Sequence, residues 1–366
     1  MSEIFTRFSG SYATDDVEFL LTPITLEPID VAEKERRIQA GAHYSEMLSP
    51  ERAPGADYMA AYTQALAENG AKLAGHINLL ADEIIRRGWA QGTAERPAAI
   101  ISLARAGTPI GVLLNRALRH RGAFVTHYSV SIIRGRGIDL NAMRHIMARH
   151  DNCFFVDGWT GKGAISKELR GPAGPLAVGL EPRLVVVADP AGVADLAATA
   201  EDYVIPSGIL NGIVSGLISR TILNDQIGED DFHGCAILHR LADYDVSRAF
   251  VDHIDTLATV TANHICEDVP PSDTIRQALQ NDCRQMLAFV QSHYSVTDVN
   301  RIKPGIAEST RAVLRRVPDR LLICNQEDPE VRHLVLLARM KNVPIESLPA
   351  LSSYRAVAII SAMGDE

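Results

Sequence analysis

Residues 154–165 read FFVDGWTGKGAI, and this stretch decides the fold class. An apolar run ends in Asp157, a tryptophan follows, and three glycines and Lys162 come within the next few positions. Glycine lets a backbone approach a ligand closely, and successive backbone N–H groups in such a turn bind anions. The pattern therefore predicts a buried strand, a ligand-binding loop and then a helix.

Similar strand-and-loop units occur on either side of this stretch. Residues 98–107 read AAIISLARAG and residues 183–192 read RLVVVADPAG, and residues 57–88 have the spacing of one long amphipathic helix. Continuous apolar strands that alternate with helices predict an α/β protein with a mostly parallel sheet. Ligands of such sheets bind outside the carboxyl ends of the strands. We therefore expect the loops at 100–109 and 154–165 to lie side by side.

Composition excludes several classes of protein. The 366 residues carry a net charge of −9, which argues against non-specific nucleic-acid binding by the whole chain. No apolar run reaches the roughly 18 residues of a membrane helix. The five cysteines are scattered without a CxxC pair, as in free thiols of a reducing compartment. We expect a cytoplasmic protein with no membrane partner.

The charge pattern separates the C-terminal end from the rest. Residues 301–366 hold ten Lys and Arg against eight Asp and Glu, so they carry +2, and the remainder carries −11. This asymmetry predicts a separate module. Its pattern reads as helix, strand, helix, strand, so we expect a small α/β domain. The expected parts are an N-terminal extension or hood, an α/β core, a helical segment that completes the core or links it, and the C-terminal module, at residues 1–55, 56–225, 226–300 and 301–366.

The two glycine loops resemble those of type I phosphoribosyltransferases. CFFVDGWTGKGAI is similar to the family's phosphoribosyl-diphosphate signature, with Asp157 on its first acidic position and Gly158 in place of the second. SLARAGTP, residues 102–109, is similar to its pyrophosphate loop. The resemblance implies a type I phosphoribosyltransferase-like sheet with flanking helices. The alternative for each loop is a tight turn that needs glycine for its backbone alone.

That resemblance implies an activity and a set of site residues. The activity is transfer of a phosphoribosyl group from phosphoribosyl diphosphate to an unknown base-like small molecule, with Mg²⁺ and release of pyrophosphate, in a possible homodimer. Asp157, Arg105 and Lys162 would be catalytic. Pyrophosphate would contact Ala104, Arg105, Ala106 and Gly107. The ribose and the 5′-phosphate would contact Asp157, Gly158, Thr160, Gly161, Lys162, Gly163 and Ala164. A mobile loop would bring Arg134 and Arg136 to the site.

Nearly the whole chain resembles one bacterial family of tellurite-resistance and stress gene clusters. Its members are labelled either phosphoribosyltransferase or "cysteine protease StiP". At the C-terminal end, Gly305, Glu308 and Arg311 form a G-x-x-E-x-x-[KR] pattern similar to the RNA-contacting motif of Pelota and kink-turn-binding ribosomal proteins. The resemblance implies structured RNA as a partner, with Arg315 near phosphates. The alternative is a solvated amphipathic helix.

Two further functions stay open. The fold could bind a phosphorylated ribose ligand as a sensor without catalysis, since Gly158 replaces an acid. Alternatively, Cys235 could be a peptidase nucleophile, with His233 and His239 close in sequence. We disfavour the peptidase because sequence proximity says little about geometry and buried free cysteines are common.

Overall fold

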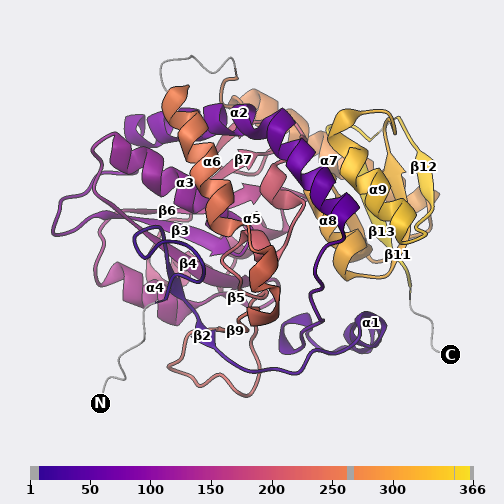
Figure 1. The fold of residues 1–366 in the computed structure, drawn as a ribbon, viewed down its shortest axis with the longest axis horizontal. Helices are drawn as coiled ribbons and strands as arrows, with labels where there is room; N and C mark the ends of the chain where they lie inside the picture. Colours follow the sequence, from indigo (N-terminus) through magenta and orange to yellow (C-terminus); the bar gives the residue numbers. More distant parts are fainter. Residues whose placement is uncertain (1–7, 262–267, 350, 363–366) are drawn as a thin grey trace.

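Six parallel strands form the centre of the protein in the order β1-β4-β3-β6-β7-β8, and β5 pairs antiparallel with β4 (Figure 1). A computed structural model describes residues 8–261, 268–349 and 351–362. The sheet confirms the predicted α/β class. Its strands are β1 Glu18–Leu20, β3 Ala98–Ala104, β4 Val125–Ile133, β5 Gly137–Ile138, β6 Cys153–Trp159, β7 Leu184–Ala188 and β8 Leu196–Thr199.

Helices cover both faces of this sheet. Successive strand residues point to opposite faces, so Ile100 and Phe154 pack in one apolar cluster, and Ile101 and Phe155 in another. The first face is covered by α2 Ala56–Arg86, α3 Gly107–His120 and α6 Ser247–Val260, and the second by α4 Leu140–Met147 and α5 Ala164–Leu169. Burial on both faces explains why the strands read as continuous apolar runs.

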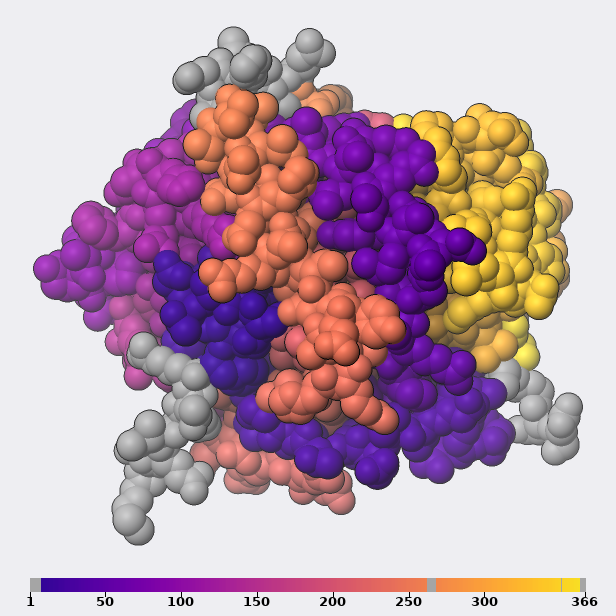
Figure 2. Space-filling model, in the orientation of Figure 1, coloured from indigo at the N-terminus to yellow at the C-terminus, as the bar shows by residue number. Residues whose placement is uncertain are grey.

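The C-terminal residues form a second, four-stranded sheet in the order β10-β13-β11-β12. Helix α7 packs on one face of it, and α8 and α9 pack on the other, between this sheet and the core (Figure 1). In the space-filling view the C-terminal residues lie directly against the residues of α2 (Figure 2). The elements are α7 Asp273–His293, β10 Ile302–Pro304, α8 Ile306–Arg315, β11 Pro318–Ile323, α9 Arg332–Met340, β12 Ile345–Ser347 and β13 Ala356–Ile360.

The N-terminal residues reach both parts of the molecule. Strand β1 extends the central sheet at its edge, and β2 Thr22–Pro23 pairs with β9 Gly234–Cys235. Helix α1 Val31–Gln39 then lies beside the end of α8, where Glu35 forms an ion pair with Arg316. The expected hood is therefore partly a strand of the core and partly a contact to the C-terminal sheet.

Candidate functional site

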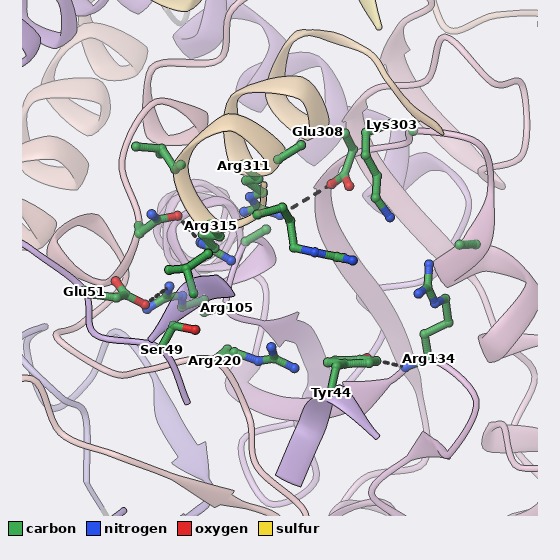
Figure 3. A pocket seen from close by; sticks show the side chains of 18 of the residues that line it. Tyr44, Ser49, Glu51, Arg105, Arg134, Arg220, Lys303, Glu308, Arg311 and Arg315 are labelled. Carbon is green, nitrogen blue, oxygen red and sulfur yellow. Dashed lines mark hydrogen bonds and ion pairs between the residues drawn. The ribbon is translucent and has the colours of Figure 1, made fainter. Parts of the chain in front are cut away.

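A cavity of about 1270 Å³ opens at the carboxyl edge of the central sheet. Its wall includes the loops after β3 and β6, the turn after β4, the N-terminal segment around α1, parts of residues 209–221 and 297–304, and the inward face of α8 (Figure 3). The two predicted glycine loops thus lie at one site, since β3 and β6 are neighbours in the sheet. The cavity is larger than most small-molecule sites, which measure roughly 300–1,000 Å³.

The walls of the cavity are strongly basic. Twelve Lys and Arg residues line it, against six Asp and Glu. The whole chain carries −9, so positive charge is concentrated here. A cleft with charge of one sign raises the local concentration of ligands of the opposite sign. The site is therefore suited to an anion.

Several of these basic groups carry an electrostatic cost in the ligand-free protein. Burial, together with the charges of nearby cations, lowers the pKa of Lys34 to about 6, of Lys303 to about 7 and of Lys162 to about 8. Burial also lowers the pKa of Arg311, and of Arg315 well below its usual range. Arginine stays protonated in proteins. The lowered pKa of an arginine therefore means that its charged side chain is destabilised by nearby cations and by lost hydration. A bound anion would offset this destabilisation.

The loop after β3 contributes Arg105 to the cavity. Arg105 forms an ion pair with Glu51, and its Nη1 donates to the carbonyl of Ile218 at 2.5 Å. Ala104 and Ala106 also line the wall, but Gly107 does not. A Cβ at Gly107 would lie 2.2 Å from the carbonyl oxygen of Val156. Glycine at 107 is therefore needed to pack α3 against β6.

The loop after β6 is covered by the C-terminal residues. Lys162 Nζ donates to the carbonyls of Val299 and, at 2.9 Å, Ile302, and the Tyr354 hydroxyl donates to the Gly161 carbonyl at 2.7 Å. Gly163, at φ +80°, precedes α5, and Ala164 begins it. The expected phosphate loop is therefore a docking surface for the C-terminal sheet, and its Lys162 is occupied by carbonyl oxygens.

Three predicted residues of this loop have different environments. Asp157 lines the cavity, and burial raises its pKa to about 7, opposed by the charge of Arg311. Gly158 donates its N–H to Asp157 Oδ1 at 2.8 Å and does not line the cavity. Thr160 is buried and donates to Asp189 Oδ1 at 2.6 Å, a contact that fixes the neighbouring turn.

Arg134 and Arg136 lie in the turn between β4 and β5. Arg134 lines the cavity, and its backbone N–H donates to the Tyr44 hydroxyl at 2.7 Å (Figure 3). Arg136 forms an ion pair with Glu46 outside the cavity lining. Both residues of the expected mobile loop therefore contact the N-terminal segment, and only Arg134 reaches the site.

Glu308 and Arg311 of the predicted RNA motif line the same cavity, as does Arg315, whereas Gly305 does not. Gly305, at φ +92°, precedes α8, and the buried Asp202 of the core accepts from the Ile306 N–H at 3.0 Å. Arg311 lies 4.4 Å from the ring centroid of Trp159, whose indole nitrogen donates to Glu308 at 3.4 Å. Arg315 donates to Asn211. The motif therefore packs on the core instead of facing open solvent (Figure 3).

Other cavity residues were not expected from the sequence. Arg220 lies 4.4 Å from the ring centroid of Tyr44, and Glu51 accepts from Arg105 and from the Gly212 N–H. Lys34 and Lys303 complete the basic wall. Lys34, Tyr44, Glu51 and Arg220 belong to no motif, and Lys303 lies just before the RNA motif. The one available signal was the charged run EKERR at 33–37, which reads as a solvated helix.

The described cysteines are free but poorly placed for nucleophilic chemistry. Cys153, Cys235 and Cys283 are buried and Cys324 is partly buried. Cys235 has no exposed surface, and burial raises the pKa of its thiol to about 12. His233 contacts Ser131 Oγ at 2.8 Å, and His239 is exposed. Among the described residues, no hydrogen bond joins Cys235 to His233 or His239, the pairing that the peptidase alternative requires, and Cys266 lies outside the described residues.

Two absences apply to the described part of the chain. Within residues 8–261, 268–349 and 351–362, no group of three His, Cys, Asp or Glu side chains is arranged to hold a metal ion. Across the same ranges, every helix is too short or too polar to span a membrane.

Comparison with known proteins identifies two regions. Residues 10–255 match the family model "Tellurite-like stress resistance cysteine protease StiP", and residues 281–362 match the "PELOTA RNA binding domain". The chain is 39% identical over 372 residues to "Cysteine protease StiP" of Acinetobacter baylyi (strain ATCC 33305 / BD413 / ADP1), a match that covers 98% of this chain and 95% of the relative.

These matches correct the expected activity. The prediction of phosphoribosyl transfer is wrong, because both the family and the relative are named as cysteine proteases. The same names indicate an enzyme and favour the peptidase alternative that the sequence analysis disfavoured. The resemblance to the stress-cluster family and to Pelota is confirmed. The chain therefore belongs to the StiP family of tellurite-like stress resistance proteins and carries a Pelota RNA-binding domain at its C-terminal end.

Proposed function

We propose that the cavity binds a compact polyanion that carries phosphate groups. The observation that supports this most directly is a set of buried guanidinium nitrogens with no hydrogen-bond acceptor among the described residues. These atoms are Arg105 Nε, Arg220 Nη2, Arg311 Nε and Arg315 Nε. Buried donors are normally paired, and an unpaired one costs about 1–3 kcal/mol. A ligand that accepts hydrogen bonds would satisfy several of them together.

Phosphate suits this wall better than an isolated carboxylate does. The planar guanidinium fork matches the geometry of phosphate oxygens, and charge-assisted bonds of this type are about twice as strong as neutral ones. Three of the guanidinium groups, those of Arg105, Arg311 and Arg315, face one another across the loop after β3 and α8 (Figure 3). Such convergence favours a ligand with more than one phosphate.

The phosphate groups could come from a small molecule or from an RNA end. The second source is consistent with the RNA-binding domain match at residues 281–362. Because Glu308, Arg311 and Arg315 all line the cavity, RNA would meet them there and not on the outer surface. Both sources share one chemistry, and a binding experiment separates them.

We expect a phosphate-bearing ligand to bind in the cavity together with Mg²⁺. Asp157 and Glu308 both line the cavity, and their charges repel each other. Mg²⁺ is usually held by one or two carboxylates together with phosphate oxygens and water. These two residues therefore suit a magnesium ion that the ligand's phosphates help to bind.

The test is isothermal titration of the full-length protein at constant ionic strength. Sodium tripolyphosphate is compared with sulfate, with a 5′-phosphorylated RNA trinucleotide and with its 5′-hydroxyl counterpart, each with and without Mg²⁺. We expect saturable one-to-one binding of tripolyphosphate, weakened at least about tenfold in Arg315→Ala, the equivalent of about 1.4 kcal/mol. Arg119→Ala is the control, since Arg119 pairs with Asp15 away from the cavity.

The probes in this titration distinguish the two possible sources of the phosphate. Binding of the phosphorylated trinucleotide in competition with tripolyphosphate, without binding of the hydroxyl form, would identify an RNA end as the phosphate source. Binding of tripolyphosphate alone would favour a small molecule. Absence of binding by every probe, or equal binding by wild type and Arg315→Ala, would refute the proposal.

A second candidate function is peptide hydrolysis by a cysteine, which the names of the family and the relative favour. A nucleophilic cysteine needs an accessible thiolate, and burial raises the thiol pKa of Cys153 and Cys235 to about 12. Hydrolysis of labelled casein by the wild type and by five single Cys→Ala variants tests it. Loss of hydrolysis in one variant would identify the nucleophile. Full hydrolysis in all five would exclude a thiol mechanism.

A further inference from the structure

The carboxylate of Glu51 lies at a point of the cavity wall where hydrogen-bond donors converge. Its Oε1 accepts from Arg105 Nη2 (Figure 3), and its Oε2 accepts from the Gly212 N–H at 3.1 Å. The side chain of Glu51 is only 13% exposed. A guanidinium and a backbone N–H that point at one buried carboxylate are donors of the kind with which proteins bind anions.

The core holds these two donors together without help from Glu51. Arg105 is fixed by the Ile218 carbonyl, to which its Nη1 donates at 2.5 Å. A Cβ at Gly212 would lie 2.8 Å from Arg105 Nη1 and 2.9 Å from the Ile218 carbonyl oxygen. Glycine at 212 therefore lets a backbone N–H lie beside the guanidinium. Glu51 itself comes from the connection between α1 and α2, so the donors and the carboxylate belong to different parts of the chain.

Glu51 satisfies these donors incompletely. Arg105 donates through Nη1 to Ile218 and through Nη2 to Glu51, but its buried Nε has no acceptor in the part of the chain that the structure describes. Together with the Gly212 N–H, the wall therefore has three donors around an anion with two oxygens. A terminal phosphate has three unesterified oxygens, whereas a phosphate within a chain or ring has two. The donors therefore suit a terminal phosphate better than the carboxylate they now hold.

Glu51 is also the hydrogen-bonded anchor of residues 49–54, SPERAP. Within the described ranges, the hydrogen bonds of this segment are the two that Glu51 accepts, and the buried Ser49 Oγ has no partner. Leu48 and Gly55 on either side make backbone hydrogen bonds. Segments with few hydrogen bonds open at a low cost in free energy. Loss of the Glu51 contacts would therefore free residues 49–54 between two fixed ends.

We propose that Glu51 occupies a phosphate subsite in the ligand-free protein and that a terminal phosphate of the ligand replaces it at Arg105 and Gly212. This subsite rests on the proposed phosphate binding and narrows the ligand to molecules that end in a phosphate. The exchange breaks no covalent bond, since the carboxylate moves into solvent with residues 49–54. Because Glu51 competes with the ligand, the apparent affinity is reduced by the fraction of protein in which the subsite is free.

The test compares tripolyphosphate with trimetaphosphate by isothermal titration of the full-length protein at constant ionic strength. Trimetaphosphate has the same number of phosphorus atoms in a ring, so it has no terminal phosphate. Glu51→Gln keeps the size of the side chain and removes its charge. We expect this variant to bind tripolyphosphate at least about fivefold more tightly than the wild type, and trimetaphosphate within about twofold of it. Glu46→Gln is the matched control, because Glu46 pairs with Arg136 outside the cavity lining.

Tryptic cleavage after the exposed Arg52 gives a second readout on the wild type itself. Tripolyphosphate should speed this cleavage by releasing residues 49–54, and trimetaphosphate should not. Rates are divided by those for a synthetic peptide of residues 47–57, so that effects on trypsin cancel. Faster cleavage with a 5′-phosphorylated RNA trinucleotide, but not with its 5′-hydroxyl form, would identify an RNA end as the source of the phosphate. Faster cleavage with tripolyphosphate alone would favour a small molecule.

The failures of the two proposals are distinguishable. Equal tightening of both polyphosphates in Glu51→Gln would show a general effect of charge, and unchanged or weaker binding of tripolyphosphate would show that Glu51 does not compete. Either result overturns the subsite and leaves phosphate binding standing. Absence of tripolyphosphate binding to the wild type and to both variants would refute phosphate binding itself.

Discussion

The guanidinium of Arg311 in α8 lies 4.4 Å from the ring centroid of Trp159 at the end of β6. This cation–π contact joins the C-terminal domain to the core at the cavity wall, and it presents one residue of the predicted RNA motif to the proposed anion site. The indole nitrogen of Trp159 also donates to Glu308 at 3.4 Å. Trp159 therefore supports two residues of α8.

Replacement of Trp159 should weaken the docking of α8. Trp159 is only 9% exposed, so Trp159→Ala should lower the free energy of unfolding by about 3–5 kcal/mol. Trp159→Phe retains a ring for Arg311 and loses one long hydrogen bond, so its cost should be about half of that or less. Urea unfolding measures both variants. Equal stabilities of the Trp159→Ala and Trp159→Phe variants would contradict the role of the ring.

Asp202 should anchor α8 from the core. Its carboxylate accepts from the N–H of Ile306 at 3.0 Å and of Arg355 at 2.9 Å. Asp202→Ala leaves one buried and one partly buried N–H donor without this acceptor, so we expect a loss of about 2–4 kcal/mol in the free energy of unfolding. Asp202→Asn keeps one acceptor oxygen and should lose less. A loss below about 0.5 kcal/mol in Asp202→Ala would show that the contact does not hold the domain.

Gly107 should tolerate no side chain, although it does not line the cavity. A Cβ there would lie 2.2 Å from the Val156 carbonyl and 3.1 Å from Asp157 Cα. Gly107→Ala should therefore destabilise the protein by about 1–3 kcal/mol, as overpacking of a core does. Thermal unfolding measures the change. Gly122→Ala provides a comparison, because nothing lies within 4 Å of a Cβ at that loop position, where the strain of φ +80° alone would act.

The stability of the ligand-free protein should depend on the Lys34 amine. The folded pKa of about 6 lies below the ordinary value of 10.5, so the unfolded chain binds more protons. The contribution of Lys34 to the free energy of unfolding is therefore fully present above about pH 10 and is lost as the pH falls through 6. From pH 7 to 9 it adds at most about 2.7 kcal/mol to the free energy of unfolding.

A variant isolates this contribution from the other titrating groups. Lys303 and Lys162 act in the same direction, while Asp157, with a pKa raised to about 7, acts in the opposite direction and mostly below this range. Lys34→Met should have a smaller rise in unfolding free energy from pH 7 to 9 than the wild type or Lys167→Met. Identical slopes in all three proteins would contradict a buried neutral Lys34.

The general architecture could be predicted because it depends on local patterns. Apolar runs at 98–104 and 153–159 that end in glycine loops predict neighbouring parallel strands, and β3 and β6 pair as expected. The long helix expected at 57–88 corresponds to α2 at Ala56–Arg86. The spacing of apolar residues was sufficient to predict these elements, since the pattern of each strand or helix lies within one short segment.

The set of residues that line the cavity could not be predicted, because it depends on contacts between segments that are distant in the sequence. Arg105 meets Glu51 across 54 positions, and Arg315 meets Asn211 across 104. The pattern of α8 also does not say which way its polar face turns. A solvent-facing helix and one packed over a basic cavity have the same sequence spacing. Lys34 reads as part of an exposed charged run for the same reason.

The most direct measurement is a crystal structure of the full-length protein with tripolyphosphate. The account predicts phosphate density in the cavity at the carboxyl edge of the sheet. Its oxygens should lie within hydrogen-bond distance of the guanidinium nitrogens of Arg105, Arg311 and Arg315 that now have no described acceptor. Density confined to another surface, or a cavity without phosphate at saturating concentration, would contradict it.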